Sequence, residues 1–127
     1  MRVRILRSVR PGYVVVLSSD AAGPALWRGA DSPLEGVDYD VEVDIPDAVE
    51  WTAMQVTSEA GQLPHDRGDV LVLRGTIHQI DDDGVIALKV AGSIVLVETS
   101  GDLPQSTLGQ SVLLTSGSAA IYPTNNP

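Results

Sequence analysis

The sequence predicts an all-β protein that folds as a single antiparallel barrel or sandwich. Residues 70–98, VLVLRGTIHQIDDDGVIALKVAGSIVLVE, contain three runs rich in Val, Ile and Leu. Asp- and Gly-containing turns separate these runs, a pattern typical of strands joined as hairpins. Residues 37–45, VDYDVEVDI, alternate apolar and acidic side chains with the period of a strand. The chain length of 127 residues suits one domain. We expect this β-domain to cover residues 1–122, followed by a frayed tail at residues 123–127.

The first strands are predicted before residue 30. Residues 3–6 alternate between two faces and form the first candidate. Residues 13–17, YVVVL, are apolar at every position, so we expect a central strand that is buried on both faces. Residues 18–24 have the polar and glycine content of a loop. Residues 26–28 are predicted to form another short strand.

The strand predicted at residues 37–45 has one apolar and one acidic face, because successive side chains of a strand point to opposite sides. The apolar side carries Val37, Tyr39, Val41, Val43 and Ile45, and the other side carries Asp38, Asp40, Glu42 and Asp44. We call these four carboxylates the acidic face. Their mutual repulsion lowers stability unless arginines or other cations lie beside them.

Residues 48–59, AVEWTAMQVTSE, allow two interpretations. Asp47 and Glu50 have the spacing of an N-terminal capping pair, which favours one short helix that ends at Gly61. The Trp, Thr and Val content of the segment favours a strand instead. Both interpretations stay open.

The C-terminal half is predicted to continue the sheet. Gly75 interrupts the first run of residues 70–98 and predicts a bulge or bend. After a loop at residues 99–106, two more strands are expected at residues 111–115 and 119–122. Five strands from residue 70 onward, the first bent by a glycine, suggest an OB-like barrel as one candidate arrangement.

Composition argues against several classes of protein. The chain has no cysteine, which excludes disulfides, thiolate metal sites and thiol nucleophiles. No apolar run is long enough for a transmembrane helix, and the N-terminus lacks a signal-peptide pattern, so we expect a cytoplasmic protein with no membrane partner. The net charge of −9 repels phosphate backbones. Residues 70–127 hold only two lysines or arginines and one aromatic side chain, so we expect no nucleic-acid partner.

No catalytic set is evident. His65 lies beside Asp66 in a predicted loop and His78 lies on a predicted strand, without the spacing of a metal motif or an activated nucleophile. Asp81-Asp82-Asp83-Gly84 resembles the start of a calcium loop, but Gly92 occupies the position where that loop needs a glutamate. A hairpin turn is the better interpretation. We expect no catalytic residue, no metal site and no cofactor.

The acidic face is the candidate site, and it has structural as well as functional interpretations. Its charges could protect an edge strand from aggregation, or pair across strands with Arg2 and Arg4. As a functional surface it suits a basic protein partner. We expect a non-enzymatic protein-interaction module, such as an accessory subunit or an immunity-type inhibitor. The alternatives are a small hydrolase that uses carboxylates with His65 or a bound metal, and a self-assembling β-protein that forms a homo-oligomer.

Overall fold

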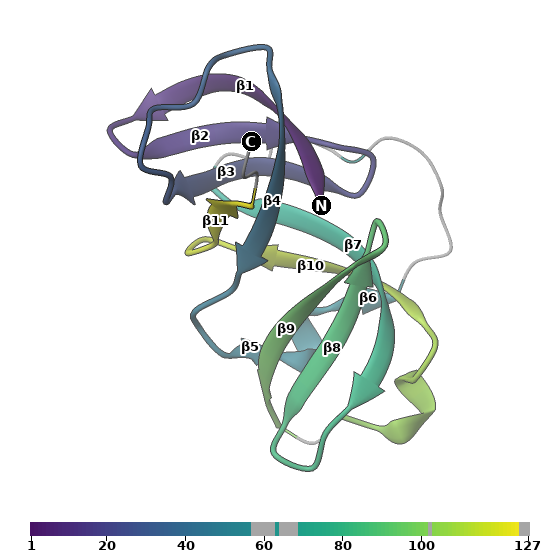
Figure 1. Ribbon diagram of the computed structural model, residues 1–127. Coiled ribbons are helices and arrows are strands. Elements are labelled where there is room, and N and C mark those ends of the chain that lie inside the picture. Colours follow the sequence, from purple (N-terminus) through teal and green to yellow (C-terminus); the bar gives the residue numbers. More distant parts are fainter. Residues whose placement is uncertain (57–62, 64–68, 102, 125–127) are drawn as a thin grey trace.

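Every regular element in the described part of the chain is a β-strand, apart from two single-turn 3-10 helices at Trp51–Ala53 and Gln105–Thr107 (Figure 1). The computed structural model describes residues 1–56, 63, 69–101 and 103–124. The strands are β1 (Arg2–Arg10), β2 (Tyr13–Leu17), β3 (Ala21–Trp27), β4 (Asp38–Asp44), β5 (Val49–Glu50), β6 (Gln55–Val56), β7 (Leu71–Ile80), β8 (Val85–Val90), β9 (Ser93–Ser100), β10 (Ser111–Ser116) and β11 (Ala120–Pro123). The predicted all-β fold class is confirmed.

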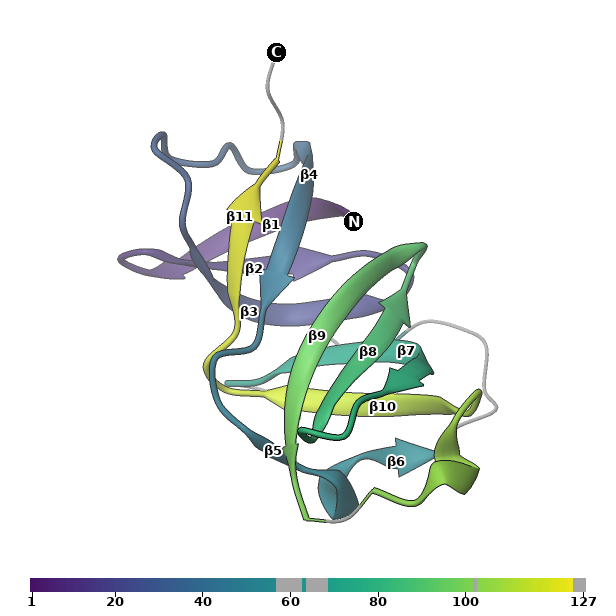
Figure 2. The ribbon, with the colours of Figure 1, turned by 60° about the horizontal axis from the view of Figure 1, so that its bottom comes forward.

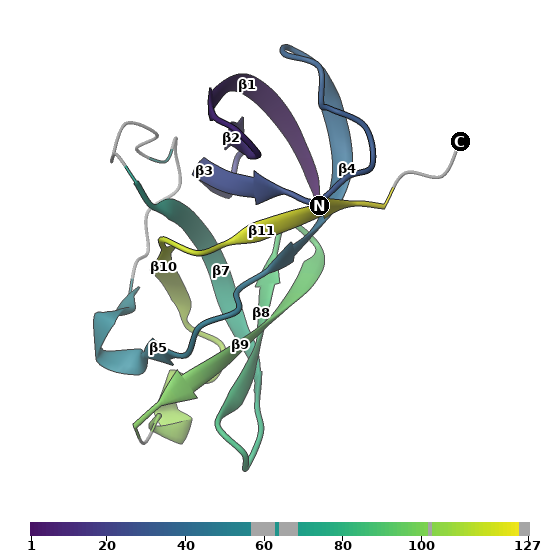
Figure 3. The ribbon, with the colours of Figure 1, turned by 90° about the vertical axis from the view of Figure 1, so that its left-hand side faces the viewer.

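Five of these strands close on themselves as a barrel, which we call the ring. β1 pairs antiparallel with β2 and with β4, and β2 pairs antiparallel with β3. β11 completes the ring because it pairs parallel with β3 and antiparallel with β4. Figures 2 and 3 show β11 running beside β4. A barrel is therefore present, as one of the two predicted architectures.

The ring is not made from the strands that suggested an OB-like barrel. Four of its five strands precede residue 45, and only β11 comes from the region after residue 70. Two of the N-terminal strands are longer than predicted: β1 extends to Arg10, and β3 begins at Ala21 inside the expected loop. β2 has the predicted bounds. Because β1 and β3 are longer, the part of the chain before the meander forms four of the five strands of the barrel.

β3 tolerates Pro24 because this proline lies where the strand changes partner. On one edge, β3 pairs with β7 at Ala21 and Ala22, and with β11 at Leu26 and Trp27. The hydrogen bonds of an antiparallel pair alternate along the strand. The Trp27 N–H donates to the Gly12 carbonyl on the β2 side at 2.7 Å, so Pro24 directs its nitrogen to the opposite edge, between the two partners. No ladder hydrogen bond is lost there.

The predicted meander is confirmed as β7, β8 and β9, which pair antiparallel in chain order. β10 pairs with the other side of β7, and the short strands β6 and β5 lie at the two outer margins of this sheet. The pairing of β3 with β7 joins the sheet to the ring. One buried cluster extends through both parts, from Val3 and Ile5 in the ring to Leu88 and Val97 in the sheet.

The turns of the meander follow the chemistry of their residues. Asp81 to Gly84 form the predicted hairpin turn, in which Gly84 has φ 87° and its N–H donates to the Asp81 carbonyl. The bulge lies between Ile77 and Gln79, two residues beyond its predicted position. Gly75 instead accommodates a close approach of β8, because a Cβ atom there would lie 2.7 Å from the Leu88 side chain.

In the segment from Val49 to Val56, the strand interpretation is confirmed in part and the helix interpretation is wrong. The segment contains two short strands, β5 and β6, joined through the 3-10 turn, and no α-helix forms in its described residues. The expected capping pair fails, since the 3-10 turn follows Glu50 without a side-chain cap. Pairing of β5 with β9 and of β6 with β10 outweighs the local capping signal. Residues 57–59 lie outside the described part.

Two residues of the predicted tail are held in place. Pro123 pairs with Val41 at the end of β11, and the Thr124 N–H donates to the Asp40 carbonyl oxygen at 2.9 Å. Residues 125–127 lie outside the described part of the chain. In the described ranges, no helix has the length and apolarity that crossing a bilayer would need.

Candidate protein-docking site

β4 presents the two faces that its alternating sequence predicts. Val41 and Ile45 are buried, while Asp40, Glu42 and Asp44 are exposed and Asp38 is half-buried. Tyr39 and Val43 are half-buried, and Val37, which precedes β4, is exposed. The pleat of β4 therefore directs the acidic face outward and Val41 inward, which is the arrangement on which a surface role depends.

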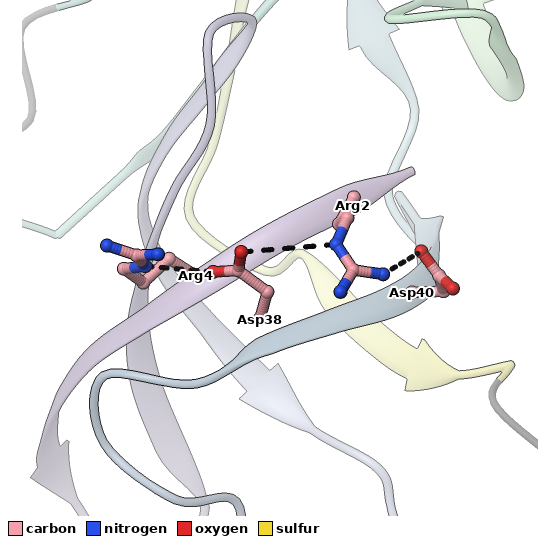
Figure 4. A network of polar contacts seen from close by, with 4 residues as sticks. All are labelled: Arg2, Arg4, Asp38 and Asp40. Carbon is pink, nitrogen blue, oxygen red and sulfur yellow. Dashed lines mark hydrogen bonds and ion pairs between the residues drawn. The ribbon is translucent and has the colours of Figure 1, made fainter. Parts of the chain in front are cut away.

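The N-terminal half of the acidic face pairs with arginines of β1 (Figure 4). The register of the two strands places Arg2 opposite Asp40 and Arg4 opposite Asp38. The Arg4 Nε lies 2.8 Å from Asp38 Oδ1, and the Arg2 Nη1 lies 3.2 Å from Asp40 Oδ1. Asp38 also lies 3.9 Å from the Arg2 Nε. The predicted cross-strand pairing is thus present for two of the four carboxylates.

These ion pairs reduce the charge that this part of β4 offers to a partner. The hydrogen bond from the Arg4 guanidinium lowers the pKa of the Asp38 carboxyl below its usual value, and the nearby charges of Arg4 and Arg2 add to the effect. The same bond raises the pKa of Arg4. Both groups therefore stay ionised at neutral pH and largely neutralise one another.

The C-terminal half of the acidic face differs. Within the described ranges, no lysine or arginine lies in ion-pair distance of Glu42 or Asp44. The β1–β4 ladder ends where the Val41 N–H donates to the Met1 carbonyl at 2.7 Å. Beyond Val41, β4 pairs with β11 alone, so no arginine of β1 stands opposite these two carboxylates.

Glu42 and Asp44 line a groove of about 870 Å³ between β4 and β9, which pass close to one another (Figure 2). Three exposed apolar side chains line it as well: Ile94 and Leu96 of β9, which are 51% and 62% exposed, and Tyr122 of β11, which is 40% exposed. We call this hollow the docking groove; its lining residues are Met1, Val41, Glu42, Val43, Asp44, Ser93, Ile94, Val95, Leu96, Tyr122 and Thr124.

The apolar part of the docking groove was not predicted from the sequence. In β9, apolar residues occupy both faces of the first half of the strand, since Val95 and Val97 are buried while Ile94 and Leu96 are exposed. A strand of this pattern is expected to be buried on both sides. The apolar residues on both faces of β9 indicate an exposed surface only when the position of this strand near the margin of its sheet is known.

A second ion pair that joins distant segments was also missed. Arg74 of β7 donates from Nε to Asp20 Oδ1 at 2.9 Å and from Nη2 to the Ser19 carbonyl at 2.7 Å. The Arg74 side chain is only 15% exposed. This contact ties the β2–β3 turn to the meander, which is a structural role.

The described residues offer no cluster of side chains suited to a metal ion. No three of their His, Asp or Glu side chains come together in a way that could hold a metal ion. His78 is exposed on β7. His65, which the hydrolase alternative requires, lies outside the described residues.

Comparison of the chain with protein-family models, curated proteins and solved structures gives no match.

Proposed function

We propose that this chain is a non-enzymatic protein-interaction module that binds a basic protein partner through the docking groove. One observation carries the proposal: Glu42 and Asp44 have no cationic partner among the described residues and lie beside exposed Ile94, Leu96 and Tyr122. Of the four carboxylates of the acidic face, we assign binding to Glu42 and Asp44 and not to Asp38 and Asp40, because Arg4 and Arg2 already pair with the latter two.

The composition of the docking groove suits a protein partner. Interfaces combine exposed apolar and aromatic contacts with a polar rim, and exposed apolar residues that cluster rather than scatter mark interaction sites. The two carboxylates would select for lysine or arginine on the partner and reject acidic surfaces. A net charge of −9 would also steer a cationic protein toward this molecule.

The test is capture of partners from a lysate of the source organism, with identification by mass spectrometry. The variant Glu42→Lys/Asp44→Lys reverses both groove charges. The matched control, Asp31→Lys/Asp82→Lys, makes the same change in net charge at two exposed loop positions outside the groove. We expect a basic partner that the wild type and the control retain and the groove variant loses, with binding that weakens as salt rises. A partner that the groove variant retains, or that both variants lose equally, would contradict the proposal.

The captured partner also distinguishes an immunity-type inhibitor from an accessory subunit. Once the captured protein is identified, its own activity is measured with and without the purified chain. A fall in activity on addition of the chain indicates an immunity-type inhibitor, and unchanged or increased activity indicates an accessory subunit.

A further inference from the structure

β9 has an open edge along the docking groove. On one side it pairs with β8 from Ser93 to Glu98. On the other side its described pairing is with β5, at Thr99 and Ser100 only. In the described part of the chain, residues 93–98 therefore have no hydrogen-bonded strand on this second side.

The register identifies which backbone groups face the open edge. The Thr99 N–H donates to the Gly84 carbonyl on the β8 side at 2.8 Å. Since backbone groups alternate between the two edges of an antiparallel strand, Val97 and Val95 also bond toward β8. The N–H and C=O groups of Ile94 and Leu96 and the N–H of Glu98 consequently point to the open side, whereas the Glu98 C=O lies where the pairing with β5 begins.

This edge lacks much of the protection that natural sheets give to their margins. Open edges are usually shielded by charged side chains, prolines, bulges or a covering segment. Here Ile94 and Leu96 are apolar and exposed, and Glu98 is the single charge among the three edge-facing residues. Such an edge can accept an added strand, in which main-chain hydrogen bonds supply affinity and alternate side chains supply specificity.

We propose that the docking groove receives an extended segment of the basic partner, which adds to β9 as a further strand. This inference rests on the proposed function and specifies its mode of recognition. One set of alternate side chains of the segment is apolar and packs beside Ile94 and Leu96. The other set carries lysine or arginine and reaches Glu42 and Asp44.

The charges favour a basic segment over a second copy of this chain. Two copies that paired through β9 would bring Glu98 and the groove carboxylates of both molecules to one interface, and like charges on adjacent strands oppose pairing. Each copy also carries a net charge of −9. A cationic strand relieves this repulsion, whereas a second copy doubles it.

The test uses peptide probes and amide hydrogen exchange of the whole protein, followed by NMR. The first probe is a blocked octapeptide of alternating Lys and Val. The second has the same composition with the lysines and valines in two separate blocks, and the third replaces Lys by Glu. With the first probe at ten times its dissociation constant, we expect exchange at Ile94, Leu96 and Glu98 to slow about tenfold, because about one tenth of the protein remains free. The turn amides of Ala91 and Gly92 should not slow.

Variants supply a matched pair. Leu96→Lys places a protective charge on the open edge and should weaken binding of the alternating peptide, whereas Leu108→Lys, at an exposed position outside the groove, should leave it unchanged. Equal effects of the alternating and block peptides at β9, or no slowing at its edge amides, would overturn strand addition. Protection of these amides without peptide, growing with protein concentration, would also overturn it by showing self-pairing. Capture that still depends on Glu42 and Asp44 would then leave the proposed function standing.

Discussion

At the scale of single residues, Gly23 shows how little space separates the ring from the sheet. Its φ of 131° is a conformation that other residues rarely adopt, and it lies in β3 next to the start of β7. A Cβ atom at this position would collide with the Val70 carbonyl oxygen and lie 2.9 Å from the Leu71 Cα. These are backbone atoms, which cannot rotate away. The absence of a side chain therefore allows β3 to pack against β7.

We predict that Gly23→Ala lowers the free energy of unfolding by about 3 kcal/mol, the sum of left-handed backbone strain and a steric clash. Urea denaturation measures the change. Gly36→Ala is the matched control, since Gly36 also has a positive φ of 78° but a Cβ atom added there would meet no other atom within 4 Å. It should cost only the backbone strain, about 1 kcal/mol. Equal losses in the two variants would show that the contact with β7 is unimportant.

At the scale of elements, β4 is divided into a paired and an unpaired half. The alternation in its sequence correctly predicted which residues face outward, because burial of one face fixes that pattern locally. The division itself depends on register with β1, a segment more than thirty residues earlier. The alternating Arg2 and Arg4 signalled that pairing was available. They could not indicate that it would stop before Glu42.

The paired half should make stability depend on pH. The pKa of Asp38 is lowered by Arg4, so its contribution is fully present above the unfolded-state pKa, about 4. It is lost as the pH falls through the lower folded-state value. We predict that Asp38→Asn is slightly less stable than the wild type at pH 7, and that the difference vanishes at acidic pH below 4. Thermal unfolding across a pH series measures this. A difference that is unchanged down to pH 2 would contradict it.

Elements defined by long-range contacts were harder to predict than those defined locally. The meander was predicted correctly because its turns lie next to its strands in sequence. The start of β3 was mistaken for a loop, since Gly23 and Pro24 are turn residues by composition, and only the switch between two partner strands explains them. Of the two interpretations of residues 48–59, the helix failed for a similar reason: pairing with β9 and β10 is a tertiary effect that local capping signals do not contain.

At the scale of the whole molecule, the ring depends on β11. This strand pairs with both β3 and β4, and its Ile121 is fully buried. The sequence predicted a barrel or sandwich and a strand at residues 119–122, yet it could not reveal that this strand closes the barrel. Strand order in a barrel is set by pairings between distant segments, and hydrophobic periodicity contains no information about such pairings.

We predict that Ile121→Ala lowers the free energy of unfolding by roughly 2–5 kcal/mol, as for other large-to-small core substitutions. Amide exchange should accelerate in both β3 and β4, because the substitution weakens the strand that joins them. Chemical denaturation and NMR exchange measure the two effects. Val9→Ala, at a half-exposed position of β1, is the control and should change stability by about 0.5 kcal/mol or less. Exchange that accelerates in only one neighbour would show that the ring is not held by β11.

Because β11 follows the other strands in the chain, the ring can close only late in translation. β1 to β4 leave the ribosome early, but the seam between β3 and β4 stays open until residues 120–123 have been translated. During this interval the apolar lining of the nascent barrel is accessible to chaperones and to neighbouring nascent chains. The meander, whose strands follow one another directly, can form while translation continues. Synonymous codon changes that slow elongation between β4 and β11 should therefore increase aggregation of the newly made protein.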